Sequence, residues 1–141
     1  MATVYADKYT DHFQTSPPSK AHASLWGGRL KVQYGLYEAS SVGAGSIIYF
    51  FKVPANATVW DINLHFDALG SSSTLAVGDS GDIDRYIDAT DSSSAGAVNM
   101  GEGANIDGFG YLNSSETDIY ITTAGATISG TIKMSVVYSV D

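Results

Sequence analysis

Residues 127–140, which read TISGTIKMSVVYSV, alternate between apolar and polar side chains along most of their length. Alternation with a period of two is the pattern of a β-strand that buries one face. We therefore predict a long strand here, and its length favours a central position in a sheet. The side chains expected to face inward are Ile128, Gly130, Ile132, Met134, Val136, Tyr138 and Val140.

The same alternation occurs at residues 30–36 and 58–67. Each pattern predicts a strand with one buried face. In the first segment, the apolar row that alternates with Lys31, Gln33 and Gly35 consists of Leu30, Val32, Tyr34 and Leu36. In the second, His65 is expected on the solvent side, and the apolar row consists of Thr58, Trp60, Ile62, Leu64 and Phe66.

Residues 47–53, IIYFFKV, are almost continuously apolar, which predicts a strand that is covered on both faces or lies centrally. Shorter strands are expected at residues 74–78, 109–112 and 118–123, which gives about eight strands in all. Residues 79–110 are rich in Asp, Ser and Gly. We predict a long irregular segment there, functional or mobile, interrupted only by a short strand or turn near residues 83–87.

The composition of the 141 residues favours sheet over helix. Ile, Val, Thr, Tyr, Phe and Trp number 47, whereas Glu, Gln, Lys, Arg and Met number only 15. The first group packs well on pleated sheets and the second favours helices. Parallel sheets need crossover helices, and none is visible. We predict an all-β fold, an antiparallel jelly-roll-like sandwich or small barrel, with an extended N-terminal arm.

The charge is unevenly distributed along the chain. Residues 1–52 carry a net charge of +2 and residues 53–141 a net charge of −10. An acidic body argues against a nucleic-acid partner, because phosphate binding needs clustered Lys and Arg. The absence of cysteine excludes disulfides and Cys-based zinc sites. The longest apolar run is too short to span a membrane, so no membrane partner is expected.

The first 28 residues differ from the rest of the chain. They lack a strong strand pattern, and Pro17 and Pro18 block the continuation of any helix. We predict two parts, an extended arm at residues 1–28 and a β-sandwich domain at residues 29–141. The arm would anchor on its own body or, as we favour, on a partner, through the aromatic side chains of Tyr5, Tyr9, Phe13 and Trp26.

Acidic side chains crowd into residues 79–91. Asp79, Asp82 and Asp84 supply the hard oxygen ligands that calcium prefers, although their spacing does not match an EF-hand loop. The favoured interpretation is that they form turns, with Arg85 paired to one of them. No cofactor other than this possible calcium ion is expected. The three histidines, His12, His22 and His65, have no metal-binding spacing.

Catalytic motifs are missing from the sequence. It has no Gly-x-Ser-x-Gly elbow and no cysteine nucleophile, so we do not expect an enzyme. A carboxylate pair for glycoside hydrolysis stays open, because any two Asp can meet in space.

Three features of the sequence occur together: the aromatic arm of residues 1–28, the pair 47–53 and 59–66 joined by PANA, and LAVGDSGDIDRYID at residues 75–88. Together they resemble the head decoration, or cement, proteins of tailed bacteriophages. The resemblance implies a structural virion protein of jelly-roll type on the capsid exterior. It also implies docking on the major capsid protein, self-association as a homotrimer and no catalysis.

An alternative interpretation is a carbohydrate- or receptor-binding β-sandwich module of a phage fibre or spike. Trp26, Trp60, Tyr86 and Tyr111 would then stack on sugars. The expected position of Trp60 on the apolar face argues against this alternative.

Overall fold

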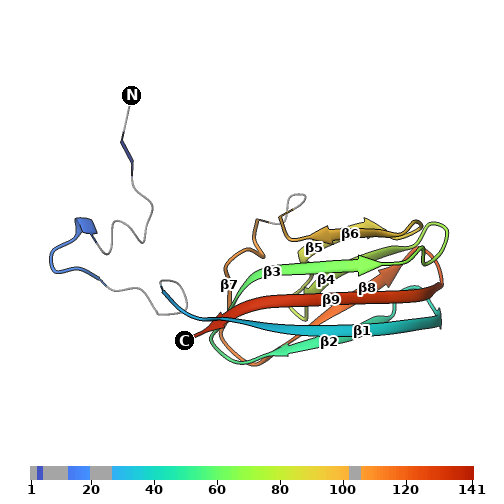
Figure 1. The fold of residues 1–141 in the computed structure, drawn as a ribbon, viewed down its shortest axis with the longest axis horizontal. Helices are drawn as coiled ribbons and strands as arrows, with labels where there is room; N and C mark the ends of the chain where they lie inside the picture. The colour runs from blue at the N-terminus through green and yellow to red at the C-terminus, as the bar shows by residue number, and fades with distance from the viewer. Residues whose placement is uncertain (1–2, 5–12, 20–26, 102–105) are drawn as a thin grey trace.

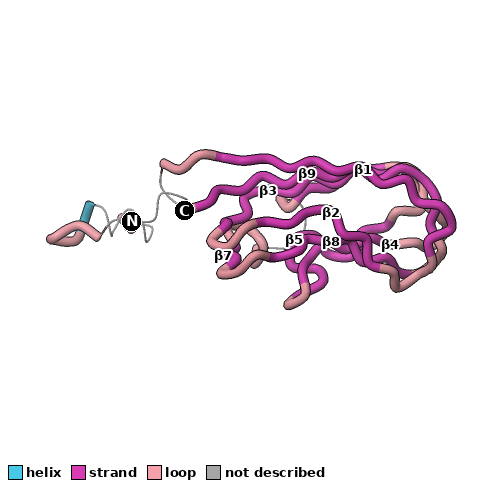
Figure 2. The backbone as a smooth tube through the Cα atoms, turned by 90° about the horizontal axis from the view of Figure 1, so that it is seen from below, coloured by secondary structure: helices cyan, strands magenta, loops and turns pink. Residues whose placement is uncertain are grey.

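The computed structural model describes residues 3–4, 13–19, 27–101 and 106–141. These residues contain nine strands in two antiparallel sheets that pack face to face (Figures 1 and 2). The strands are β1 (Leu30–Val42), β2 (Ile47–Val53), β3 (Ala57–Phe66), β4 (Thr74–Asp79), β5 (Asp82–Asp91), β6 (Gly96–Asn99), β7 (Tyr111–Asn113), β8 (Thr117–Ala124) and β9 (Ile128–Val140). No helix in the described residues is long and apolar enough to cross a membrane.

The strand order is that of a jelly roll. Sheet A has the order β1-β9-β3-β6, with β7 also pairing with β3, and sheet B has the order β2-β8-β4-β5. The pairs nest from the outside of the chain inward, as β1 with β9, β2 with β8, β3 with β6 and β7, and β4 with β5. Nested pairs of this kind arise when one long antiparallel hairpin folds over so that its strands are shared between two sheets. The two packed antiparallel sheets confirm the all-β sandwich prediction.

The core lies between the sheets, and β9 contributes a row of side chains to it. Ile128, Ile132 and Val136 are completely buried, and Met134 and Tyr138 nearly so. β9 lies between β1 and β3, which confirms its predicted central position. A side chain at such a position is covered by the opposite sheet and by strands on both sides.

A bulge in β3 overturns the prediction for Trp60. Val59 pairs with Tyr138 of β9 and Asp61 pairs with Val137, so Trp60 is the extra residue. An extra residue shifts the alternation by one position. Trp60 therefore lies on the outer face, where its Nε1 donates a hydrogen bond to Ser139 Oγ at 2.8 Å.

The prediction for the faces of β1 is also wrong. The apolar row is exposed, and the residues on the other face, Gln33, Gly35, Tyr37 and Ala39, are the more buried ones. The ring of Phe50 packs so closely against Gly35 that a Cβ there would lie 2.9 Å from it. The small residues Gly35 and Ala39 thus let β1 approach the opposite sheet, and the larger apolar row points outward.

Two further expectations are corrected. β2 is an edge strand of sheet B, neither central nor covered on both faces, and Ile47 and Tyr49 are exposed. The segment 79–110 is more regular than predicted, because the short strand expected near residues 83–87 is part of the ten-residue β5 and residues 96–99 form β6. The register of β5 against β4 shifts twice, and the neighbouring residues Tyr86 and Ile87 are both buried. The two register shifts and the two adjacent buried residues interrupt the period-two alternation of β5, so the sequence pattern did not reveal the full strand.

Candidate functional surface

The acidic segment forms a turn around one buried carboxylate. Asp79, at the end of β4, is 3% exposed. Its Oδ1 accepts hydrogen bonds from the backbone N–H groups of Gly81 at 2.9 Å and Asp82 at 3.1 Å. Its Oδ2 accepts one from Arg85 Nε at 2.8 Å. The oxygens of Asp79 are therefore occupied by donors of the turn and by a cation of the same chain.

Asp82 and Asp84 lie on the exposed side of β5 and interact with each other. The hydrogen bond between their side chains raises the pKa of Asp84 and lowers that of Asp82. Burial and the charges of Asp82 and Asp88 raise the pKa of Asp84 further. Within the described ranges, no group of three or more His, Asp or Glu side chains is arranged to hold a metal ion.

Of the four predicted arm anchors, only Phe13 belongs to the described residues, and its side chain is 60% exposed. Tyr5, Tyr9 and Trp26 lie outside them. Their role in binding a partner stays a prediction.

The clearest surface feature is the apolar row on β1, which sequence reasoning assigned to the core. Its four side chains are half to two-thirds exposed, at 66% for Leu30, 67% for Val32, 62% for Tyr34 and 50% for Leu36. Scattered exposed apolar residues are normal, but a contiguous row marks an interaction site. The signal that could have revealed it is Gly35, since a glycine within a strand often marks a site where another group packs closely, here the ring of Phe50.

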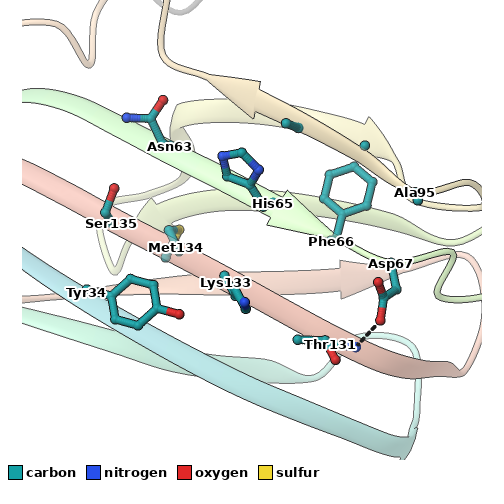
Figure 3. A pocket seen from close by; sticks show the side chains of 12 residues that line it. Tyr34, Asn63, His65, Phe66, Asp67, Ala95, Thr131, Lys133, Met134 and Ser135 are labelled. Carbon is teal, nitrogen blue, oxygen red and sulfur yellow. Dashed lines mark hydrogen bonds between the residues drawn. The ribbon is translucent and has the colours of Figure 1, made fainter.

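Next to this row, the outer face of sheet A is hollowed (Figure 3). The open hollow has a volume of about 1010 Å³. Its lining comes from four strands and includes Tyr34 of β1, Asn63 and His65 of β3, Ala97 of β6, and Lys133 and Ser135 of β9. At one end, Thr131 N–H donates to Asp67 Oδ2 at 3.1 Å. The hollow offers hydrogen-bonding groups beside apolar surface, which suits binding of a polypeptide or a saccharide.

The outward turn of Trp60 creates a second aromatic feature on the same sheet. Its ring meets that of Phe109 edge to face, with 5.8 Å between the ring centroids. Phe109 is 63% exposed. Tyr86 is buried and Tyr111 is half-buried, with the guanidinium of Arg85 3.9 Å from the Tyr111 ring centroid. Trp60, Tyr86 and Tyr111 are the described residues that we proposed to stack on sugars. Among these three, Trp60 is the one that lies on the outer face beside an exposed aromatic ring, that of Phe109.

No protein-family model and no curated protein matches this chain. Among solved structures, it is similar to a chain of the cyanophage Pam1 capsid asymmetric unit, with 23% identity and a TM-score of 0.63 over 87% of this chain and 91% of that one. A chain of the capsid of Ralstonia phage GP4 is 18% identical, with a TM-score of 0.66 over 81% and 86%. A chain of the acidic stable capsid of Helicobacter pylori bacteriophage KHP30 is 12% identical, with a TM-score of 0.58 over 79% and 87%. The sandwich described above is therefore a fold that this chain shares with chains of three bacteriophage capsids.

Proposed function

We propose that this chain is a structural virion protein that decorates and stabilises a phage capsid from its exterior by docking on the major capsid subunits. The observation that carries the proposal is the similarity of most of the chain to chains in three phage capsid structures. Jelly rolls are a recurrent architecture of capsid proteins, so the fold is compatible with this role. The proposed role is not enzymatic.

The surface supports a role in assembly. The body is a two-sheet sandwich, and its apolar row on β1 lies on a regular strand. A preformed apolar surface loses little conformational entropy when it binds, which favours association with another protein chain.

We further propose that residues 1–28 attach the protein and that residues 29–141 fold as the body. Ordering an extended segment costs about 1–2 kcal/mol per residue in backbone entropy. Burial of the aromatics Tyr5, Tyr9, Phe13 and Trp26 on a partner would offset this cost. The resemblance noted from the sequence also implies self-association as a homotrimer.

Particles assembled without this protein provide the test of the docking role. We expect the purified full-length chain to sediment with such particles and to appear as a density on their outer surface in electron microscopy. A chain that stays in the supernatant at saturating concentration contradicts the proposal. Hydrolysis of a polysaccharide or peptide that an Asp→Asn change abolishes contradicts the non-enzymatic role.

The arm is tested by a chain that begins at Arg29. We expect it to melt cooperatively and to lose binding to the particles. Binding as tight as that of the full chain would make the body the docking surface, and failure to fold would make the arm part of the β core.

The outward position of Trp60 beside Phe109 favours a second candidate, a carbohydrate- or receptor-binding module of a fibre or spike. Aromatic rings exposed on a sheet face can stack on sugar rings. A glycan array with the full chain tests it, with Trp60→Ala as the variant expected to lose any signal. A signal that Trp60→Ala leaves unchanged excludes this surface.

A further inference from the structure

We propose that β1 is a self-association edge, which pairs antiparallel with β1 of a second copy about a two-fold axis at Gln33. Sheet A of the two copies would then form one continuous sheet. The inference concerns the protein in solution and does not depend on the capsid role.

The first observation is the open edge of β1. The strand is 13 residues long and, within the described part of the chain, pairs with β9 alone. β2 runs beside it but belongs to the other sheet, and Gln33 Nε2 connects them by donating to the carbonyl of Lys52 at 3.0 Å. The backbone groups on the free side of a long edge strand are a template for another strand.

The second observation is the outward row of Leu30, Val32, Tyr34 and Leu36, each at least 50% exposed. Natural edge strands usually avoid pairing by placing charges on the edge. Here four consecutive outward positions are apolar instead, which leaves both the backbone edge and its side chains suited to a partner strand.

The third observation is the symmetry of that row, and it identifies the partner as a second copy. A two-fold axis perpendicular to a sheet keeps the outward faces of both strands on the same side. With the axis at Gln33, Leu30 lies opposite Leu36 of the partner subunit, and Val32 lies opposite Tyr34 of the partner subunit. Every apolar side chain of the row then meets another apolar side chain, and such cross-strand pairs stabilise a sheet.

Neighbouring registers lose this match. An axis at Tyr34 places Leu30 opposite Glu38 of the partner subunit, and an axis at Val32 places Leu36 opposite Gly28 of the partner subunit. The charge of Lys31 also fits the Gln33 register. Lys31 lies opposite Gly35 of the partner subunit, so it meets no like charge.

The other sheet supports the same arrangement. β2 lies at the same side of the sandwich as β1 (Figure 1), and its outward side chains Ile47 and Tyr49 are 48% and 65% exposed. The two-fold axis that joins the β1 edges therefore brings the β2 edges toward each other. The predicted β1 contact gives a dimer, whereas the resemblance to cement proteins implies a trimer. The number of chains in the complex in solution therefore distinguishes these two arrangements.

Sedimentation of the full chain at micromolar concentration is the first test, and we expect a dimer. Val32→Lys should raise the dissociation constant at least about tenfold, because it places a charge opposite Tyr34 of the partner subunit. Leu112→Lys is the matched control, since Leu112 is 52% exposed on β7, away from the β1 edge, and should leave the dimer intact. A monomer, a trimer, or a dimer that Val32→Lys leaves unchanged overturns the proposal.

The register is tested by cross-linking, because the chain has no cysteine of its own. The double variant with Val32→Cys and Tyr34→Cys places cysteines opposite each other and should oxidise to a covalent dimer. The variant with Val32→Cys and Leu36→Cys should not form a covalent dimer. In the Gln33 register these two positions lie opposite Tyr34 and Leu30 of the partner subunit, so no two cysteines face each other. Equal cross-linking of both variants overturns that register.

Discussion

Arg85 binds both carboxylate oxygens of Asp79, with Nε 2.8 Å from Oδ2 and Nη2 3.2 Å from Oδ1. The Asp79 side chain is only 5% exposed and the Arg85 side chain 15%. The carbonyl of Asp79 also accepts a hydrogen bond from the Tyr120 hydroxyl at 2.9 Å, which ties the β4–β5 turn to β8. The Arg85–Asp79 pair and the Tyr120 hydrogen bond thus hold the start of the acidic segment in place.

Replacing Arg85 by Met should destabilise the fold by about 3 kcal/mol, because it leaves the buried carboxylate of Asp79 without its cation. Urea denaturation measures the change. Lys52→Met is the matched control, since Lys52 pairs with Asp118 at 3.0 Å with its side chain 58% exposed, and the midpoint should hardly move. Equal losses in both variants would show that burial of the Asp79 pair is unimportant.

Gly78→Ala should destabilise the β4–β5 hairpin by at least about 2 kcal/mol. A Cβ at this position would collide with backbone atoms of Asp82 and Ile83, which cannot move as a side chain can. Gly43→Ala is the control, because no atom lies within 4 Å of its Cβ position. Thermal melts of the two variants should therefore separate clearly. A Gly78→Ala variant as stable as the parent would contradict the close approach.

Asp84→Asn should stabilise the protein slightly at neutral pH, by about 0.5 kcal/mol at most because the site is exposed. The folded pKa of Asp84 is raised above its ordinary value of 3.8. The folded state therefore binds this proton more tightly than the unfolded state, and stability falls as the pH rises through the raised pKa. Above that range Asp84 is a carboxylate near Asp82 and Asp88, and the variant removes this repulsion.

The gain from Asp84→Asn should disappear below pH 3.8, where Asp84 is protonated in both states, and should shrink in high salt. Asp107→Asn, at an exposed position outside the strands, is the control. Melting curves between pH 3 and pH 8 measure both variants. A gain that is independent of pH would rule out the electrostatic cause.

Leu64→Ala and Leu36→Ala compare the two faces of sheet A. Leu64 is completely buried and should lose about 2–5 kcal/mol on truncation. Leu36 is 50% exposed, so its truncation should cost below about 1 kcal/mol when stability is measured at a concentration where the protein is monomeric. A large loss for Leu36→Ala under those conditions would mean that its side chain is buried within one chain.

The sequence alone determined the class of the fold and most of its strands. The alternation of residues 127–140 identifies β9 and its inward face, and the apolar run at residues 47–53 coincides with β2. These strands can be predicted from sequence because period-two alternation and a high content of β-branched residues are properties of a short stretch of chain. The identity of Arg85 as a partner for the acidic turn was also accessible, because the two lie close in the chain.

Tertiary structure alone decided which faces are buried where the local pattern is ambiguous. Both faces of β1 carry apolar residues. Phe50 of β2, in the opposite sheet, packs closely against Gly35, and the apolar row that begins at Leu30 therefore faces outward. The pairing of β3 with β9 includes the bulge that places the Trp60 side chain on the outer face instead of the core face. β5 became recognisable only by its pairing with β4. The physical reason is that hydrogen-bond register and edge position depend on strands distant in the chain, so they are properties of the assembled sandwich.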